Sequence, residues 1–192
     1  LAYKKLATNN PSPFSSYLKL NGDAIITFSP ERFLRVHDRT VETKPIKGTA
    51  ARSNDATQDR HAAQQLLASE KDKAENLMIV DLLRNDISKS CMPGSVKAPK
   101  LFALESFPHV HHLVSTIRGT LKTDQHALDL LRHCFPGGSI TGAPKLSAMN
   151  IIEKLEPHHR SVYCGSMAYV DINGNMDSNI TIRTLICNQN RI

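Results

Sequence analysis

The spacing of apolar residues changes several times along the 192 residues, and this limits the folds open to the chain. Residues 10–49 carry short apolar runs between proline and Asn-Gly turns, a pattern that predicts strands. Residues 57–88 carry apolar residues at helical spacing, which predicts a long helix with at most one interruption. Residues 95–121 return to the alternation of strands. One mixed α+β domain explains this order better than two domains do.

The C-terminal third is predicted to hold two helices and a hairpin. The helices cover about 124–134 and 143–156, with Pro144 near the first turn of the second, where a missing N–H costs little. The hairpin pairs Cys164–Ile172 with Ile180–Cys187 around an Asn173-Gly174 turn.

Composition narrows the function classes. Hydrophobic residues make up 40% and charged residues 22%, as in globular proteins. The net charge of +6 would suit nucleic acid, but the basic residues are scattered and aromatic residues are only 5%. We therefore expect no nucleic-acid partner, and a non-catalytic basic nucleic-acid-binding module is the alternative of a different class. No apolar run long enough to span a membrane, no signal peptide and no cysteine spacing typical of zinc or disulfides is present, which favours a cytoplasmic protein without a membrane partner.

Two strand ends carry candidate catalytic side chains. Lys47 precedes a Gly-Thr step in PIKGT, where it could act as a nucleophile or as an anion clamp. The alternative is a solvated lysine at a turn. Glu31 follows a strand and is a candidate general acid if its pKa is raised. Its alternative is an ion pair with the neighbouring Arg32.

Asp72 and Glu75 are three residues apart on the predicted long helix and share one face. Carboxylates that leave other positions to substrate oxygens and water suit Mg²⁺. The alternative is a solvated acidic face balanced by Lys71 and Lys73.

A glycine-rich loop runs from Phe135 to Lys145 into a predicted helix, where free N–H groups favour a carboxylate or a phosphate. Ala143 and Pro144 stand where a P-loop needs Lys and Ser or Thr, so an NTPase site is disfavoured and a plain helix cap is the alternative. Arg183, between apolar residues of a predicted strand, needs a partner that is either a substrate carboxylate or a structural acid.

Three histidines fall in a predicted strand. His111 and His112 are adjacent and should face opposite sides of the sheet. His109 and His111 could form a metal pair, but no third ligand is evident.

In order and spacing these segments resemble the chorismate-binding enzymes, which include anthranilate, aminodeoxychorismate, isochorismate and salicylate synthases. The resemblance covers nearly the whole chain. It rests on Asn10-Pro11 with Pro13-Phe14-Ser15, SPERFL from Ser29, PIKGT from Pro45, AENLMIVDLLRND from Ala74, VHHLVST from Val110, FPGGSITGAPK from Phe135 and ITIRTL from Ile180.

Within this family the lysine of PIKGT marks members that aminate chorismate at C4, whereas anthranilate synthases typically have alanine there. The resemblance thus implies conversion of chorismate and ammonia to 4-amino-4-deoxychorismate, on the route to p-aminobenzoate and folate. Ammonia would come from a glutamine amidotransferase subunit, and Mg²⁺ would be the cofactor. Anthranilate synthase component I or another chorismate-utilising enzyme is the alternative.

The resemblance also implies roles for individual residues. Lys47 would attack ring carbon C2, Glu31 would protonate the departing C4 hydroxyl, and His112 would lie against the ring. Glu75 would bind Mg²⁺, with Asp72 in or near its outer shell. The substrate-binding residues would be Gly48, Thr49, Thr141, Tyr163 and Arg183.

The implied fold is an antiparallel β-sandwich with helices packed outside. We expect residues 1–192 to be a chorismate-binding domain that is incomplete at both its N- and C-terminal ends. It would then lack the second metal-binding glutamate and a downstream glycine-rich loop, and would be inactive alone.

Overall fold

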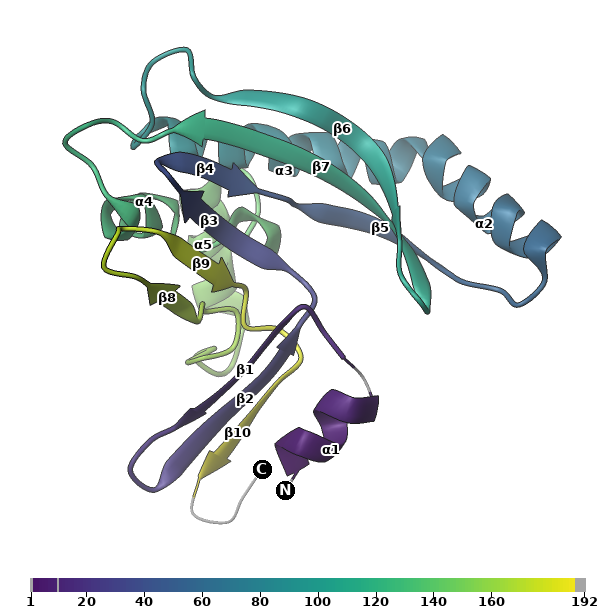
Figure 1. Cartoon of the computed structure of the whole chain (residues 1–192), viewed down its shortest axis with the longest axis horizontal. Coiled ribbons are helices and arrows are strands. Elements are labelled where there is room, and N and C mark those ends of the chain that lie inside the picture. Colours follow the sequence, from purple (N-terminus) through teal and green to yellow (C-terminus); the bar gives the residue numbers. More distant parts are fainter. Residues whose placement is uncertain (1, 10, 189–192) are drawn as a thin grey trace.

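The computed structural model describes residues 2–9 and 11–188 (Figure 1). The helices are α1 (Ala2–Asn9), α2 (Ala56–Ala68), α3 (Glu70–Ser88), α4 (Ala127–Cys134), the 3-10 turn η1 (Gly138–Ile140) and α5 (Lys145–Leu155). The strands are β1 (Phe14–Lys19), β2 (Asp23–Ser29), β3 (Arg32–His37), β4 (Thr40–Thr43), β5 (Ile46–Ala51), β6 (Lys97–Ser106), β7 (Val110–Thr120), β8 (Ala168–Val170), β9 (Met176–Asn179) and β10 (Thr184–Asn188). Within the described ranges no helix is both long and apolar enough to span a bilayer.

The described strands form two antiparallel sheets. The smaller sheet has the order β1-β2-β10, and the larger has the order β5-β7-β4-β3-β9-β8, with β6 also paired to β7. The chain passes from the smaller sheet to the larger one at Pro30-Glu31, between β2 and β3. Figure 1 shows the smaller sheet beside the larger one, with α1 next to it. The expected α+β class, with antiparallel sheets and helices packed outside them, is confirmed.

The long helix crosses one face of the larger sheet, where α3 packs on β5 and β7 (Figure 1). Its Ile79, Val80, Leu83 and Ile87 are buried in the main core. The predicted interruption lies at Ser69, which ends α2 and caps α3 by accepting the N–H of Asp72 at 3.2 Å. This cap fixes where α3 starts, and so which of its side chains face β5.

The predicted C-terminal hairpin is partly wrong. The Asn173-Gly174 turn is present, but it joins the short strands β8 and β9 of the larger sheet. The next strand, β10, pairs with β2 in the smaller sheet instead. The segment between β9 and β10 leaves the larger sheet because Thr181 exchanges backbone hydrogen bonds with Cys164 and Gly165. Arg183 then adopts a φ of +51°, which ends any continuous strand.

Candidate active site

A β-bulge in β5 sets the direction of Lys47. The pairing of β5 with β7 shifts register between Ile46 and Thr49, and Gly48 inside the bulge has a φ of +84°. Glycine at a positive φ is the usual requirement of such a bulge, which re-aims the neighbouring side chains. A Cβ on Gly48 would lie 2.9 Å from Leu66 and 3.0 Å from Asp72, so α2 and α3 press directly on this backbone.

Lys47 reaches away from bulk solvent. Its Nζ lies 3.1 Å from Oε1 of Glu75 on α3 and donates to the carbonyl of Ser139 at 3.4 Å. The side chain is 21% exposed. The alternative of a solvated lysine at a turn is therefore wrong, and the amine lies between α3 and the glycine-rich loop.

Glu31 lies close to Lys47 and has an altered acidity. Burial raises the pKa of its carboxyl, while a hydrogen bond from the Ser139 side chain and the positive charge of Lys47 oppose the rise. The suggested pair with Arg32 is wrong, because Arg32 binds Asp177 at 2.9 and 3.0 Å. A carboxyl with a raised pKa is suited to donating a proton near neutral pH.

His112 lies on β7 beside the bulge. Its Nδ1 is 2.9 Å from Oγ1 of Thr49. Burial lowers the pKa of the imidazole, against the opposing effect of a hydrogen bond to the Gly48 backbone, so the neutral ring is favoured. His111 faces the other way and contacts Ser106 and Asp59, at 2.7 and 3.1 Å. The prediction that the two neighbours face opposite sides is confirmed.

Asp72 and Glu75 both lie near the bulge, and both could offer oxygens to a metal. Glu75 is 43% exposed and is paired through Oε1, and the Asp72 carboxylate accepts no hydrogen bond from the described residues. Lys73 is paired with Glu70 at 3.0 Å rather than with either of them. No group of three or more metal-ligating side chains occurs among the described residues. The donor set thus fits part of an Mg²⁺ site, which needs only one or two carboxylates besides water and substrate oxygens.

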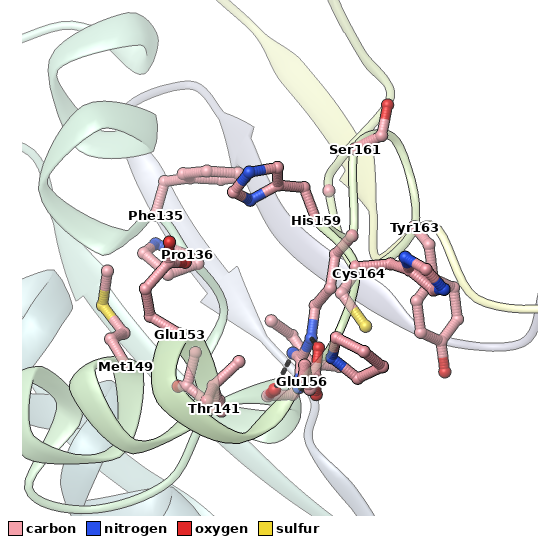
Figure 2. Close-up of a pocket in the computed structure, with 16 residues that line it drawn as sticks. Phe135, Pro136, Thr141, Met149, Glu153, Glu156, His159, Ser161, Tyr163 and Cys164 are labelled. Carbon is pink, nitrogen blue, oxygen red and sulfur yellow. Dashed lines mark hydrogen bonds and ion pairs between the residues drawn. The ribbon is translucent and has the colours of Figure 1, made fainter.

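Thr141 and Tyr163 line a cavity of about 280 Å³ to which Lys47 does not contribute (Figure 2). Thr141 donates to the carbonyl of Gly137 at 3.0 Å. Tyr163 is half-exposed, and the adjacent Cys164 raises the pKa of its hydroxyl. Arg160 borders the same cavity and is held by Glu156 at 2.6 and 2.8 Å.

The sequence predicted that Arg183 lies inside a hairpin strand. In the structure it lies just before β10. It lines a second cavity, of about 210 Å³, together with His112. It forms no ion pair with a residue that the structure describes, so the alternative of a structural pair finds no partner there. The guanidinium is exposed and available to an anion.

The structure thus brings Glu31, Lys47, Glu75 and the Gly48-Thr49 step together with His112. Thr141 and Tyr163 line the cavity of about 280 Å³, to which none of these residues contributes. Sequence reasoning missed Ser139, whose carbonyl and side chain contact Lys47 and Glu31. Its position inside the glycine-rich loop was the only available signal.

Comparisons with known proteins show the family to which the chain belongs. The family described as chorismate binding enzyme matches residues 1–192. The chain is 54% identical to aminodeoxychorismate synthase component 1 of Salmonella typhimurium, over 100% of this chain and 42% of the relative. It is 47% identical to anthranilate synthase component 1 of Saccharolobus solfataricus, over 97% and 44%. The crystal structure of anthranilate synthase component I from Streptococcus pneumoniae superposes with a TM-score of 0.86 at 38% identity, over 96% of this chain and 40% of that one. The chain therefore spans about two fifths of the length of these relatives.

Proposed function

Because the chain belongs to the chorismate-binding enzyme family, we propose that it carries the nucleophile and the acid of an enzyme that converts chorismate and ammonia to 4-amino-4-deoxychorismate. The observation that carries the proposal is the amine of Lys47, 3.1 Å from Glu75 and bound to the same Ser139 that contacts Glu31. The product would serve p-aminobenzoate and folate synthesis.

The first step needs an uncharged amine and a protonated acid. Moving one proton from Lys47 to Glu31 supplies both, and burial of Glu31 favours the protonated form of that carboxyl. The Lys47 nitrogen then forms a bond to ring carbon C2 as the ring double bonds shift and the C4–O bond breaks. Glu31 gives its proton to the departing hydroxyl, which leaves as water.

The second step restores both residues. The adduct nitrogen keeps its protons, so Lys47 can leave as a neutral amine. Ammonia forms the C4–N bond as the bond from C2 to Lys47 breaks. The new C4 ammonium then gives one proton to Glu31, and the net products are 4-amino-4-deoxychorismate and water. Two displacements at opposite ends of the same π system keep the new amine at the position of the lost hydroxyl.

The other candidate residues would bind the substrate or Mg²⁺ and take no part in the covalent steps. Neutral His112 would lie against the ring, and Gly48, Thr49, Thr141, Tyr163 and Arg183 would bind the substrate carboxylates. Glu75 would hold Mg²⁺, with Asp72 in or near its outer shell, and the metal would supply positive charge for a substrate carboxylate. Calorimetric titration with Mg²⁺ checks this, since Glu75→Gln should weaken Mg²⁺ binding while Glu70→Gln should not.

The proposal includes a glutamine amidotransferase partner as the ammonia source. It also places the protein in the cytoplasm, where the buried thiols of Cys91, Cys134 and Cys164 would stay reduced.

The test is product analysis with the full-length protein that contains this chain. Incubation with chorismate, ammonium and Mg²⁺ should give 4-amino-4-deoxychorismate on chromatography. Lys47→Ala should remove this product, while Lys100→Ala, at an exposed lysine of β6, should retain it. Fluorescent anthranilate as the main product, made equally well by Lys47→Ala, would instead assign the chain to the anthranilate-forming members of the family.

A further inference from the structure

A buried ion pair outside the Lys47 group joins α3 to the glycine-rich loop. Lys145, the first residue of α5, contacts the carboxylate of Asp86 near the end of α3. The two side chains are only 14% and 2% exposed. Ionic groups at this depth are retained only when they are well paired, because removing a charge from water is unfavourable.

The ammonium of Lys145 has a partner for each of its three hydrogens. Besides Asp86 it donates to the carbonyl of Cys134 at 2.8 Å and to the carbonyl of Pro136 at 2.8 Å. Those two carbonyls belong to the backbone at the start of the loop, on either side of Phe135. Asp86 has a second cation, the half-exposed Lys89 at 3.0 Å, so Lys145 is not needed merely to neutralise it.

The loop that Lys145 holds is also wedged between two other elements. A Cβ on Gly137 would lie 2.6 Å from Ile180, and a Cβ on Gly138 would lie 2.8 Å from Leu82 of α3. Between these glycines and Thr141 lies Ser139, whose carbonyl accepts a hydrogen bond from Lys47 and whose side chain is near enough to Glu31 to lower the pKa of that carboxyl. Lys145 therefore fixes one end of a short segment whose middle touches both proposed reacting residues.

We propose that Lys145 is a positioning residue of the active site, which holds the Cys134 and Pro136 carbonyls on Asp86 and thereby places Ser139 against Glu31 and Lys47. Lys145 touches no reacting atom and acts only through the loop. The inference rests on the proposed function for the roles of Glu31 and Lys47, but the contacts themselves do not depend on which reaction occurs.

The experiment follows the carboxyl carbon of Glu31 by ¹³C NMR across pH in the substrate-free full-length protein, with Glu31→Gln to assign the signal. Ser139→Ala removes a hydroxyl that lowers the pKa of Glu31, so this pKa should rise. Lys145→Met should raise it in the same direction. In the double variant Ser139→Ala/Lys145→Met, the pKa of Glu31 should rise no further than it does in Ser139→Ala alone. Lys154→Met, at an exposed lysine of the same helix, is the matched control and should leave the titration unchanged.

A second readout is turnover. A misplaced loop should lower kcat about 10²-fold with little change in KM. A purely structural role would lower the melting temperature but leave the Glu31 titration as it is in the wild type, and that result in folded Lys145→Met would overturn the proposal.

Lys145→Met alone leaves the buried carboxylate of Asp86 with one cation fewer, which could unfold the protein. The double variant Lys145→Met/Asp86→Asn removes both buried charges and is the control for this. It should fold and still show the raised pKa of Glu31, because the two loop carbonyls remain without their donor. Failure of this pair to fold would give Lys145 a general structural role and would also overturn the proposal. A shifted Glu31 titration in a protein that makes no 4-amino-4-deoxychorismate would refute the proposed function alone.

Discussion

Replacing Gly48 by alanine tests whether the bulge beside Lys47 is as crowded as the structure shows. The φ of +84° costs an L-residue about 1–2 kcal/mol. The new Cβ would also lie 2.9 Å from Leu66 and 3.0 Å from Asp72, and overpacking of this kind costs about 1–3 kcal/mol. The free energy of unfolding should therefore fall by about 2–5 kcal/mol, a large part of a typical domain's stability.

Gly22 offers a matched control, because its φ is +85° but a Cβ there would meet nothing within 4 Å. Gly22→Ala should lose only the backbone part, about 1–2 kcal/mol. Urea unfolding of both variants gives the difference from their midpoints, provided that the slopes agree. Turnover should fall in Gly48→Ala, since relief of the clash moves Lys47, and should be retained in Gly22→Ala. Equal losses of stability in the two variants would refute the crowding.

Three further predictions concern buried polar groups. Because burial raises the pKa of Glu31 above its ordinary 4.5, the wild type should lose stability relative to Glu31→Gln as pH rises from about 4.5 through the raised value; parallel curves in urea unfolding at several pH values would contradict this. The pKa of His112 should lie below 6.5, so its contribution to stability is lost as pH falls from 6.5 through the lowered value; an NMR midpoint at or above 6.5 would refute it. Asn76→Ala should lower the free energy of unfolding by about 1–3 kcal/mol, because the buried Ser115 hydroxyl loses the acceptor to which it donates at 2.5 Å. An unchanged denaturation midpoint would count against this.

Local signals in the sequence predicted much of the fold. Helical spacing in the sequence predicted α2 and α3 with one interruption. The structure confirms this interruption at Ser69, which ends α2 and caps α3. The Asn21-Gly22 and Asn173-Gly174 turns have glycines at positive φ, as tight turns require. Short-range patterns of this kind depend only on neighbours in the sequence.

Long-range pairing could not be predicted in the same way. The strand pattern around Ile180–Cys187 is compatible with a local hairpin, and only the tertiary fold shows that β10 joins β2. The helix α1 was not predicted, and it lies where Tyr3 can contact Phe28, with ring centroids 5.5 Å apart. Such contacts are invisible to periodicity.

In the candidate site, too, some residues were predictable from local sequence and others only from long-range contacts. Lys47 and Glu31 stood out because an amine beside glycine and a carboxyl at a strand end are chemically distinctive. Ser139, Asp86 and Lys145 carry no such local signal. Their importance depends on burial and on contacts between residues 59 apart in the sequence.

The covalent step at Lys47 is the central claim, and mass spectrometry of an acid-quenched reaction tests it most directly. With chorismate present and ammonia withheld, the second displacement cannot occur, so the lysine adduct should accumulate. The peptide that contains Lys47 should then gain the mass of chorismate less one water. An unmodified peptide, together with full turnover by Lys47→Ala, would contradict the account.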